Sequence, residues 1–289
     1  MARSDAPRES QAERKAVQPI QSGRLPLYQG LKMATSTKKN NPHAPDLPKI
    51  LVVMPMVNEE GNITKIVPEV LRQGDEFHVL ICEDESTDRT PELAEQLAVE
   101  HSGRVFVIHG KRAGLGPAYV RGFKWALERD YELVFEMDAD FSHKPEYLRP
   151  MAEIIARGEA DMVVGSRRVG GGGVENWGLY RKLLSWGGSI YTRLITGLPV
   201  KDATAGFVVY RRDVLEHIDP SKLSAGGYAF QIETKFQTWK AGYRIVEFPI
   251  IFPDRVIGET KLTKAIIKEA FTMVWKLRFS DSKKPEFEG

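Results

Sequence analysis

The sequence has almost no cysteine and no long apolar run. Its 289 residues include a single cysteine, Cys82, so no disulfide can form within the chain. Cys82 ends the apolar run that starts at Val79, which is typical of a small core residue in a reducing compartment. No stretch reaches the roughly 18–20 apolar residues of a membrane span, and no apolar segment of a secretory signal begins the chain. We therefore expect a cytosolic or peripheral membrane protein.

A strong excess of one charge is also missing. The chain carries 41 Lys and Arg against 39 Asp and Glu. Residues 1–49 hold nine of the basic and four of the acidic residues, which leaves 32 and 35, a net charge of −3, for residues 50–289. Because nucleic-acid-binding domains usually carry a broad basic field, we expect no nucleic-acid partner. A hydrophobic content of 42% is ordinary for a globular protein with a full core.

The N-terminal segment differs in composition from the rest. Residues 1–48 are rich in Pro, Ser, Lys, Arg and Asn and show no hydrophobic periodicity, so we expect a disordered tail. Met33 lies within it and is an alternative start of translation. We expect one folded domain over residues 49–280, followed by a polar tail at 281–289.

Short strand-like and helix-like segments alternate from residue 50 onward. Expected strands lie at 50–55, 78–82, 105–108, 133–137, 162–164, 206–211 and 243–252. Expected helices lie at 61–73, 90–101, 115–130, 145–157, 178–196, 229–241 and 260–278. This alternation predicts an α/β fold with a mostly parallel central sheet flanked by helices.

Acidic residues follow three of the expected strands. They are Asn58-Glu59, then Glu83-Asp84-Glu85, then Asp138-Ala139-Asp140. Because the carboxyl ends of parallel strands share one edge of the sheet, where such folds bind ligands, we expect these groups to gather there. Like charges repel, so we also expect a cation among them. Asn58 can alternatively be the N-cap of the helix that follows.

The pair Asp138 and Asp140 is the strongest chemical signal. An apolar strand runs directly into two carboxylates two residues apart, which share a face in extended backbone. Such hard oxygen ligands suit Mg²⁺ or Mn²⁺, ions that also take phosphate oxygens. Farther along, Arg181 and Ser185 share one helix face and Arg167 follows a strand, a set that suits binding of a phosphate group.

With these motifs, residues 50–261 resemble the GT-A glycosyltransferases of family 2, and among them the dolichol- or polyprenol-phosphate mannosyltransferases. The matching segments include Pro55-Met56-Val57-Asn58-Glu59-Glu60, Gly114-Leu115-Gly116-Pro117-Ala118 and Arg255-Val256-Ile257-Gly258-Glu259-Thr260-Lys261. The segment from Glu83 to Thr90 departs from the family pattern Asp-Asp-x-Ser-x-Asp-Gly-Thr at Glu83 and Arg89. Asp88 and Thr90 are interpreted as structural residues of the turn before a helix.

The resemblance implies roles for individual residues. Donor-binding residues would be Pro55, Val57, Glu59, Asp84, Asp138, Ala139, Asp140, Arg255 and Lys261. Metal contacts to Mg²⁺ or Mn²⁺ would come from Asp138, Asp140 and Ser142. Acceptor-phosphate contacts would come from Arg167, Arg181 and Ser185, and Asp140 and Arg167 would be the catalytic residues. Residues 49–140 would form the nucleotide-binding half and residues 141–261 the acceptor half.

The implied reaction is inverting transfer of mannose from GDP-mannose to dolichyl or polyprenyl phosphate. One alternative is a glucosyltransferase that uses UDP-glucose, or an enzyme that uses another sugar donor on the same acceptor. A more remote one is a non-catalytic glycosyltransferase-like subunit. The enzyme would lie on the cytosolic face of a membrane, the plasma membrane in a bacterium or the endoplasmic reticulum in a eukaryote.

The last expected helix, 262–278, has an apolar and a basic side. Its apolar arc holds Leu262, Ile266, Ile267, Ala270, Phe271, Met273, Val274 and Leu277. Lys261, Lys264, Lys268 and Lys276 lie on the other side together with Trp275. This pattern is typical of a helix in a membrane interface. The alternative is a helix packed on the protein itself or on a small membrane subunit.

Overall fold

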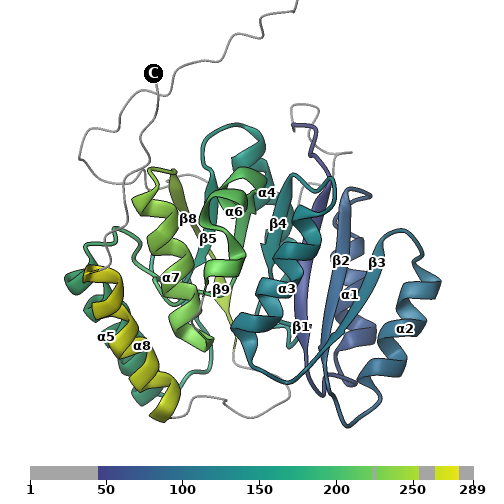
Figure 1. Cartoon of the computed structure of the whole chain (residues 1–289), viewed down its shortest axis with the longest axis horizontal. Helices are drawn as coiled ribbons and strands as arrows, with labels where there is room; N and C mark the ends of the chain where they lie inside the picture. The colour runs from purple at the N-terminus through teal and green to yellow at the C-terminus, as the bar shows by residue number, and fades with distance from the viewer. Residues whose placement is uncertain (1–44, 224–225, 254–263, 280–289) are drawn as a thin grey trace, which may run out of the picture.

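The computed structural model describes residues 45–223, 226–253 and 264–279 (Figure 1). The strands are β1 (Ile50–Met56), β2 (Phe77–Asp84), β3 (Val105–Gly110), β4 (Leu133–Glu136), β5 (Met162–Ser166), β6 (Gly173–Val174), β7 (Val208–Arg211), β8 (Ile245–Pro249) and β9 (Ile251–Phe252). The α-helices are α1 (Ile63–Leu71), α2 (Thr90–Glu100), α3 (Leu115–Leu127), α4 (Leu148–Ala156), α5 (Leu179–Thr196), α6 (Arg212–Ile218), α7 (Gly227–Lys240) and α8 (Lys264–Phe279). Two 3₁₀ turns, Pro145–Tyr147 and Pro220–Lys222, complete them.

A seven-stranded sheet forms the centre, in the order β3-β2-β1-β4-β7-β5-β8. All neighbours pair in parallel except β7, which is antiparallel to both β4 and β5. The expected α/β fold with a mostly parallel sheet is therefore confirmed. The prediction of a single strand at 243–252 is wrong, because this segment forms two strands. Strand β8 joins the main sheet, while β9 pairs with β6 in a separate two-stranded sheet.

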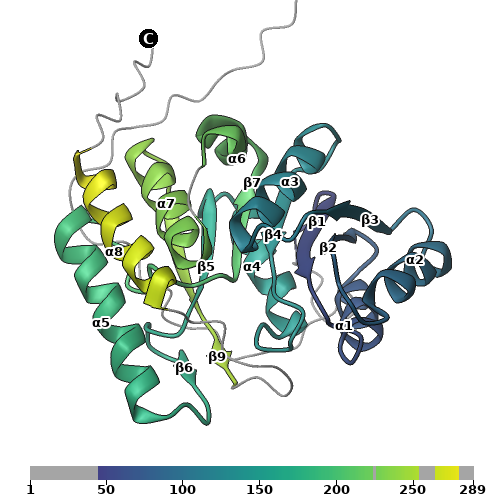
Figure 2. The ribbon, with the colours of Figure 1, turned by 60° about the horizontal axis from the view of Figure 1, so that its bottom comes forward.

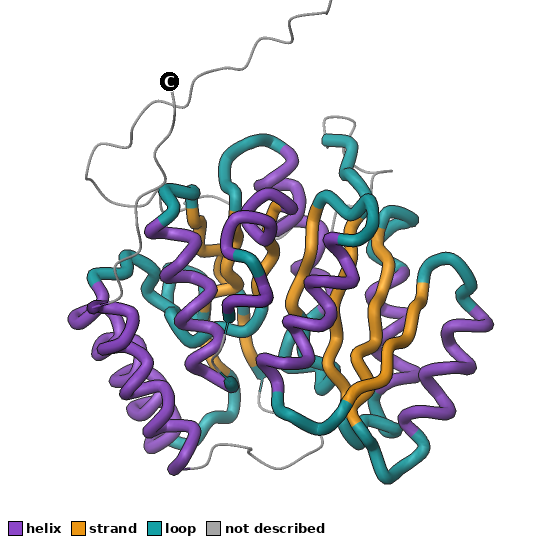
Figure 3. Tube along the Cα trace, in the orientation of Figure 1, coloured by secondary structure: helices purple, strands orange, loops and turns teal. Residues whose placement is uncertain are grey.

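Helices cover both faces of the sheet, which gives three layers (Figure 3). Side chains alternate along β1: Val52 and Met54 join the core shared with α1, α2 and α4, whereas Leu51 and Val53 join the core shared with α3, α6 and α7. This period of two is what extended backbone imposes on a strand buried on both faces. Cys82 is fully buried in the second core, and burial raises the pKa of its thiol to about 12, as expected of an inert core residue.

Helices α5, α7 and α8 lie together at one edge of the molecule (Figure 2). Helix α8 packs on α7, and α5 lies beside α8 (Figure 2). The rings of Tyr191 on α5 and Phe271 on α8 stack with their centroids 4.3 Å apart. Within the described ranges, no helix is both long enough and apolar enough to cross a bilayer.

The apolar arc expected on the last helix is divided between two environments. Met273, Val274 and Leu277 are buried in the core against the rest of the protein, so for them the packed alternative is right. Phe271 is 54% exposed, and Trp275, expected among the lysines, is 43% exposed. The side of α8 that faces solvent therefore carries aromatic residues. Leu262 lies outside the described residues.

A buried polar network lies beneath the carboxyl end of β4. The Lys235 ammonium group on α7 is fully buried and donates to the Ala205 carbonyl (2.6 Å), the Gln231 carbonyl (2.9 Å) and Gln231 Oε1 (3.1 Å). Gln231 Nε2 in turn donates to Glu136, which also accepts from Tyr210 Oη at 2.5 Å. Burial raises the pKa of Glu136 and lowers that of Lys235, and the attraction between the two charges opposes both shifts.

Replacing Lys235 by Met should destabilise the fold strongly. The substitution keeps the volume but leaves Glu136 and the Ala205 carbonyl buried without the ammonium group, which costs on the order of 3–5 kcal/mol. Urea unfolding followed by circular dichroism would measure the loss. Lys240→Met, at the exposed end of the same helix, is the matched control. Equal midpoints for the two variants would contradict a structural role for the ammonium group.

Candidate active site

The loops after β1 and β2 are tied together by side chains that bond to backbone amides. The amide of Asn58 donates to Ser86 Oγ (3.0 Å), and Asn58 Oδ1 accepts from the amide of Thr87 (2.8 Å). The amide of Glu59 donates to Thr90 Oγ1 at 2.8 Å, and that of Glu60 to Asp88 at 3.1 Å. The structural interpretation of Asp88 and Thr90 agrees with these contacts.

Asn58 is not a helix N-cap, contrary to one expectation. The N-cap of α1 is Asn62, whose side chain makes no capping bond. Asn58 instead adopts a left-handed backbone conformation with φ of 57°, which asparagine tolerates better than most residues. Its amide oxygen is thereby aimed at the neighbouring loop. Pro55 and Val57, expected to contact the donor, are half-buried on either side of the last residue of β1.

Asp84, an expected donor-binding residue, is paired with an arginine side chain. It is 3% exposed at the end of β2 and forms an ion pair with Arg121 on α3. Burial raises the pKa of Asp84, and the Arg121 charge limits the rise. Helix α3 lies close to the sheet because Gly122 has no side chain: a Cβ there would be 2.3 Å from Val53 Cγ1. This close packing brings the neighbouring Arg121 to Asp84.

Glu83, which departs from the family pattern, is held by a histidine. Glu83 and His109 are register partners on the parallel strands β2 and β3. His109 Nδ1 lies 2.9 Å from Glu83 and Nε2 lies 2.8 Å from Glu95. These hydrogen bonds raise the pKa of His109. Burial works against ionisation of Glu83, but the bonds from His109 and from the Ser86 amide outweigh it and lower the pKa of Glu83.

The carboxylates of Asp138 and Asp140 follow β4 in a tight turn. Phe141 has a positive φ of 62°, and Asp140 Oδ1 accepts from the Ser142 amide at 3.0 Å. The amide of Asp138 donates to His143 Nδ1 at 2.9 Å. The His143 ring is 2% exposed and stacks on Phe207, with ring centroids 4.8 Å apart. This packing and the bond to the Asp138 amide give His143 a structural role in the turn.

The same turn offers oxygen ligands for a divalent cation. Ser142 Oγ is buried and has no hydrogen-bond partner within the part of the chain that the structure describes. In the same ranges no three His, Cys, Asp or Glu side chains converge as a metal cluster. Two carboxylates with a hydroxyl fit Mg²⁺, which usually keeps waters and takes substrate phosphates as its other ligands. The residues present therefore fit a cation that is shared with a phosphorylated ligand.

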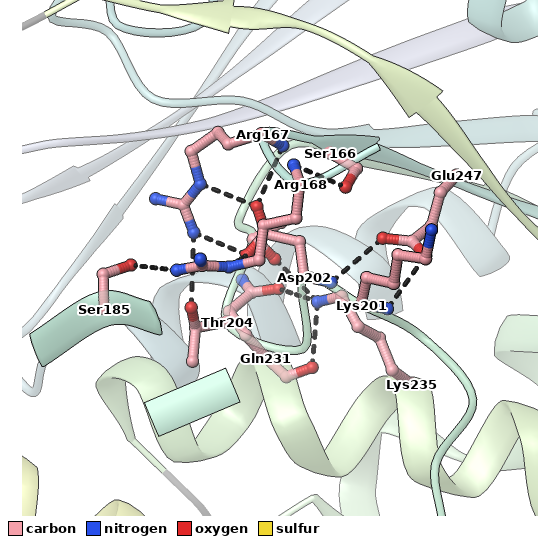
Figure 4. Close-up of polar contacts among 11 residues, drawn as sticks. Ser166, Arg167, Arg168, Ser185, Lys201, Asp202, Thr204, Gln231, Lys235 and Glu247 are labelled. Atoms are coloured by element: carbon pink, nitrogen blue, oxygen red, sulfur yellow. Dashed lines mark hydrogen bonds and ion pairs between the residues drawn. The ribbon is translucent and has the colours of Figure 1, made fainter. Parts of the chain in front are cut away.

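Arg167 is held by a carboxylate from a distant part of the sequence. Asp202, which is fully buried, accepts from Arg167 Nε (2.7 Å), Nη2 (2.7 Å) and the backbone amide (3.0 Å), as Figure 4 shows. Arg167 Nη2 also donates to Thr204 Oγ1 at 3.2 Å. Burial opposes ionisation of Asp202, but the two neighbouring arginines outweigh it and lower its pKa. Arg167 is thus fixed in one orientation before any ligand binds.

Arg181 and Ser185 lie one turn apart on α5 and have different partners. The Arg181 guanidinium lies 3.9 Å from the centre of the Trp177 ring, and that of Arg167 lies 5.5 Å from the same ring. Both arginines expected at the acceptor phosphate are therefore brought to one indole. Ser185 Oγ instead contacts Arg168 Nη2 at 2.8 Å. Arg168 was not among the expected site residues.

A phenylalanine connects the carboxylate turn with the arginines. The Phe252 ring on β9 meets His143 edge-on with centroids 5.5 Å apart, and the Arg167 guanidinium lies 5.4 Å from its centre. His143 is in turn bonded to the Asp138 amide. The expected metal-binding and acceptor-binding groups are thus neighbours across one aromatic ring.

Several residues of the site were not predicted from the sequence. They are Arg121, His109, Arg168, Asp202 and Thr204. His109 follows the rule that strand ends carry site residues and could have been found by it. Asp202 lies 35 residues from Arg167 in a segment without periodicity, so only the fold reveals the pair. The expected donor residues Arg255 and Lys261 lie outside the described residues.

The sheet and the carboxylate turn beyond β4 define the class, a glycosyltransferase of the GT-A fold. The chain belongs to the family described as "Glycosyl transferase family 2", whose model matches residues 51–219. This confirms the family that the motifs indicated.

Two curated relatives are similar along most of their length. The chain is 41% identical over 227 residues to undecaprenyl-phosphate mannosyltransferase of Micrococcus luteus. The matched region covers 78% of this chain and 92% of the relative. It is 41% identical over 233 residues to polyprenol monophosphomannose synthase of Mycolicibacterium smegmatis, covering 80% and 88%.

Solved structures share the fold at low sequence identity. Glucosyl-3-phosphoglycerate synthase from Mycobacterium tuberculosis, in complex with Mn²⁺, UDP and glucosyl-3-phosphoglycerate, superposes with a TM-score of 0.65 at 18% identity and covers 89% of this chain and 90% of its own. A mannosyltransferase from Pyrobaculum calidifontis in complex with GDP-mannose and Mn²⁺ gives a TM-score of 0.51 at 17% identity, covering 81% and 75%. These likenesses support the fold.

The contact between His109 and Glu83 should make stability depend on pH. Because the folded pKa of His109 is raised above 6.5, its contribution is complete below that value and disappears as pH rises through the folded pKa. His109→Gln should therefore cost more stability at about pH 5.5 than at about pH 8.5. Urea midpoints at both values would measure this. Because His109 is half exposed, we expect a modest effect. His101→Gln is the control, and a pH-independent difference for His109→Gln would contradict the prediction.

Proposed function

We propose that this enzyme transfers mannose from GDP-mannose to a polyprenyl or dolichyl phosphate, with inversion at the anomeric carbon. The observation that carries the proposal is the pair Arg167 and Arg181, which lie against the Trp177 ring next to the carboxylate turn. Guanidinium groups bind phosphate bidentately. The two relatives at 41% identity are named for mannose transfer to, or mannose carried on, a polyprenyl phosphate, which supports this choice of substrates.

On the donor side, the ends of β1, β2 and β4 would bind the nucleotide sugar. Pro55, Val57, Glu59 and Asp84 would contact the nucleoside, and Asp138, Ala139 and Asp140 the diphosphate. Asp138, Asp140 and Ser142 would hold Mg²⁺ or Mn²⁺. When bound, such a cation neutralises the charge that develops on the leaving diphosphate. Arg255 and Lys261 are proposed to add positive charge on the same group.

On the acceptor side, a fixed anion site replaces a general base. A phosphate monoester has a second pKa near 6, so it is already a nucleophile at neutral pH. Arg167 and Arg181, with Ser185, would orient one phosphate oxygen towards the anomeric carbon. That oxygen forms the new bond to the sugar while the bond from the sugar to the diphosphate breaks, and GDP leaves. Correct placement of the two reactants supplies much of the rate enhancement in reactions of this kind.

The exposed sides of α5 and α8 are proposed to lie on the bilayer that holds the acceptor. On α5, Leu179, Leu183, Trp186 and Leu194 are 73%, 58%, 57% and 78% exposed. On α8 the aromatic residues Phe271, Trp275 and Phe279 follow one another at intervals of four residues and are 54%, 43% and 75% exposed.

Basic residues accompany this surface. Lys182, Arg193, Lys276 and Arg278 are exposed on the same two helices. Apolar side chains mixed with Lys and Arg are typical of helices that lie in a membrane interface with anionic lipids. The surface begins beside Arg181 and Ser185, so a lipid whose phosphate is bound there would extend its chain along α5.

Product analysis tests the proposed reaction. Purified protein is incubated with GDP-mannose or UDP-glucose and a short polyprenyl phosphate, with Mg²⁺, with Mn²⁺ or with EDTA. We expect polyprenyl-phosphate mannose with GDP-mannose only, and no product with EDTA. Asp140→Ala should reduce turnover by about 10³-fold, because the loss of charge stabilisation on the leaving group costs about 4 kcal/mol. Preferred use of UDP-glucose would replace the donor in this proposal, and metal-dependent turnover by Asp140→Ala would contradict the metal site.

Binding to lipid vesicles tests the proposed membrane surface. Replacing both Trp186 and Trp275 by Ser should weaken sedimentation with anionic phospholipid vesicles by about tenfold or more, because two exposed aromatic anchors are lost. Val99→Ser is the control, since Val99 is 81% exposed on α2 at the other end of the sheet (Figure 1). Unchanged vesicle binding would contradict the bilayer and favour a membrane subunit as the partner of this surface.

A further inference from the structure

Asp84 is a charged residue at the end of an apolar row. Side chains alternate along β2, so Leu80 and Cys82, which pack in the core with α3, share a face with Asp84. Asp84 is only 3% exposed. A buried carboxylate is costly unless it is paired and hydrogen-bonded, so the partners of Asp84 decide what it can do at this edge of the sheet.

One oxygen of Asp84 is paired and the other is open. Arg121 on α3 donates from Nη2 to Asp84 Oδ1. Oδ2 accepts no hydrogen bond among the residues that the structure describes, and it is not one of the atoms sealed from solvent there. The Arg121 side chain is 30% exposed, so the ion pair borders solvent on one side. Asp84 therefore keeps one acceptor oxygen for a ligand.

Gly110 provides the space for the guanidinium group of Arg121. It is the register partner of Asp84 on β3. A Cβ at Gly110 would overlap Cζ and Nη2 of Arg121, so the guanidinium lies where a side chain of β3 would otherwise be. Gly110 is not among the glycines with a positive φ, so this space, and not an unusual backbone angle, accounts for a glycine in the strand.

The charges around Asp84 give Arg121 control over its protonation. By the same alternation Glu83 lies on the opposite face, where it contacts His109, and the Glu85 carboxylate accepts from a backbone amide of the loop after β3 at 3.1 Å. Burial raises the pKa of Asp84, and so do the charges of Glu83 and Glu85. The charge and the hydrogen bond of Arg121 lower the same pKa. Without Arg121, Asp84 would therefore become protonated at a higher pH.

We infer that Arg121, placed against Gly110, is a positioning residue for the donor base: it holds Asp84 as an ionised carboxylate whose Oδ2 accepts a ring N–H of the base. The inference rests on the proposed function and names the class of base that the donor site selects. Guanine and uracil carry a ring N–H at the edge that pairs with another base, whereas adenine has a bare ring nitrogen there. An ionised carboxylate can only accept hydrogen bonds, so it binds the first class and repels the second.

A protonated Asp84 would lose this selectivity. A neutral carboxyl group carries one O–H donor, which can bond to the bare ring nitrogen of adenine. Selectivity for guanine over adenine therefore reports on the ionisation of Asp84, and a purely structural ion pair would not affect it. The ratio of the affinities for GDP and ADP is accordingly the quantity to measure.

The test compares nucleotides that differ only in the base. Binding of GDP, UDP and ADP to the full-length chain with Mn²⁺ is measured by calorimetry at about pH 5.5 and about pH 8, and KM for GDP-mannose and for a short polyprenyl phosphate by turnover. The variants are Arg121→Gln, Arg121→Lys and Gly110→Ala, whose methyl group would displace the guanidinium while both charges remain. Lys124→Gln, on the exposed side of the same helix, is the matched control.

We expect Arg121→Gln to weaken binding of GDP and UDP, and to raise KM for GDP-mannose, by about tenfold, the order expected for a lost hydrogen bond to a charged acceptor. ADP binding should change much less. The preference for GDP should shrink more at the lower pH, because Asp84 is then protonated more readily. Gly110→Ala should act in the same direction, and Arg121→Lys should restore part of the preference. The KM for polyprenyl phosphate should match that of the Lys124→Gln control.

Several results would overturn the inference. Equal weakening of GDP and ADP, as a general loss of folded protein would cause, would leave Arg121 a structural role. Unchanged GDP binding by Arg121→Gln, or equal affinity of the wild type for GDP and ADP, would remove it from the donor site. A wild-type protein that binds GDP but transfers no mannose refutes the proposed function instead, and the ratio of GDP to ADP affinity still decides the role of Arg121.

Discussion

The need to compensate buried carboxylates governs how this protein is built around the carboxyl edge of its sheet. Asp84, Glu136 and Asp202 are each buried, and each has a cation nearby that comes from a separate segment of the chain. A buried charge without a partner costs several kcal/mol, so these contacts also fix the position of the segments that supply the cations. Helix α3 is held to β2 in this way, α7 to β4, and the segment around residue 202 to the end of β5.

The charged residues at this edge of the sheet form separate groups with different partners. Asp84 and Glu83 are paired within the chain with Arg121 and His109. The turn with Asp138 and Asp140 and the arginine cluster around Asp202 lie on either side of Phe252. In the proposed function, the carboxylate turn binds the phosphorylated donor with its cation, and the arginines bind the anionic acceptor. Electrostatic groups that are oriented in advance need no reorganisation during the reaction.

Much of this could be predicted from the sequence, because strand ends are local features. Asp138 and Asp140 stand directly after an apolar strand, and the fold rule then places them at the ligand-binding edge. The antiparallel direction of β7 was not predictable, since nothing in a four-residue strand such as Val208–Arg211 records its direction. The partners of Arg167 were also out of reach, because Asp202 meets it only through tertiary packing. The last helix was predicted as amphipathic, but which apolar residues face α7 depends on a rotation that the sequence does not specify.

The tie between the first two loops has a consequence for how an anion can approach the sheet. In dinucleotide-binding folds the backbone amides at the first strand-to-helix turn hold the pyrophosphate. Here the amides of residues 58–60 already donate to side chains of the second loop, and those of Asn62 and Ile63 donate to the carbonyl of Glu59. These five amides are therefore already hydrogen-bonded within the protein, and they are not available to bind an anion. Any diphosphate that binds at this edge has to be neutralised farther along, beyond β4.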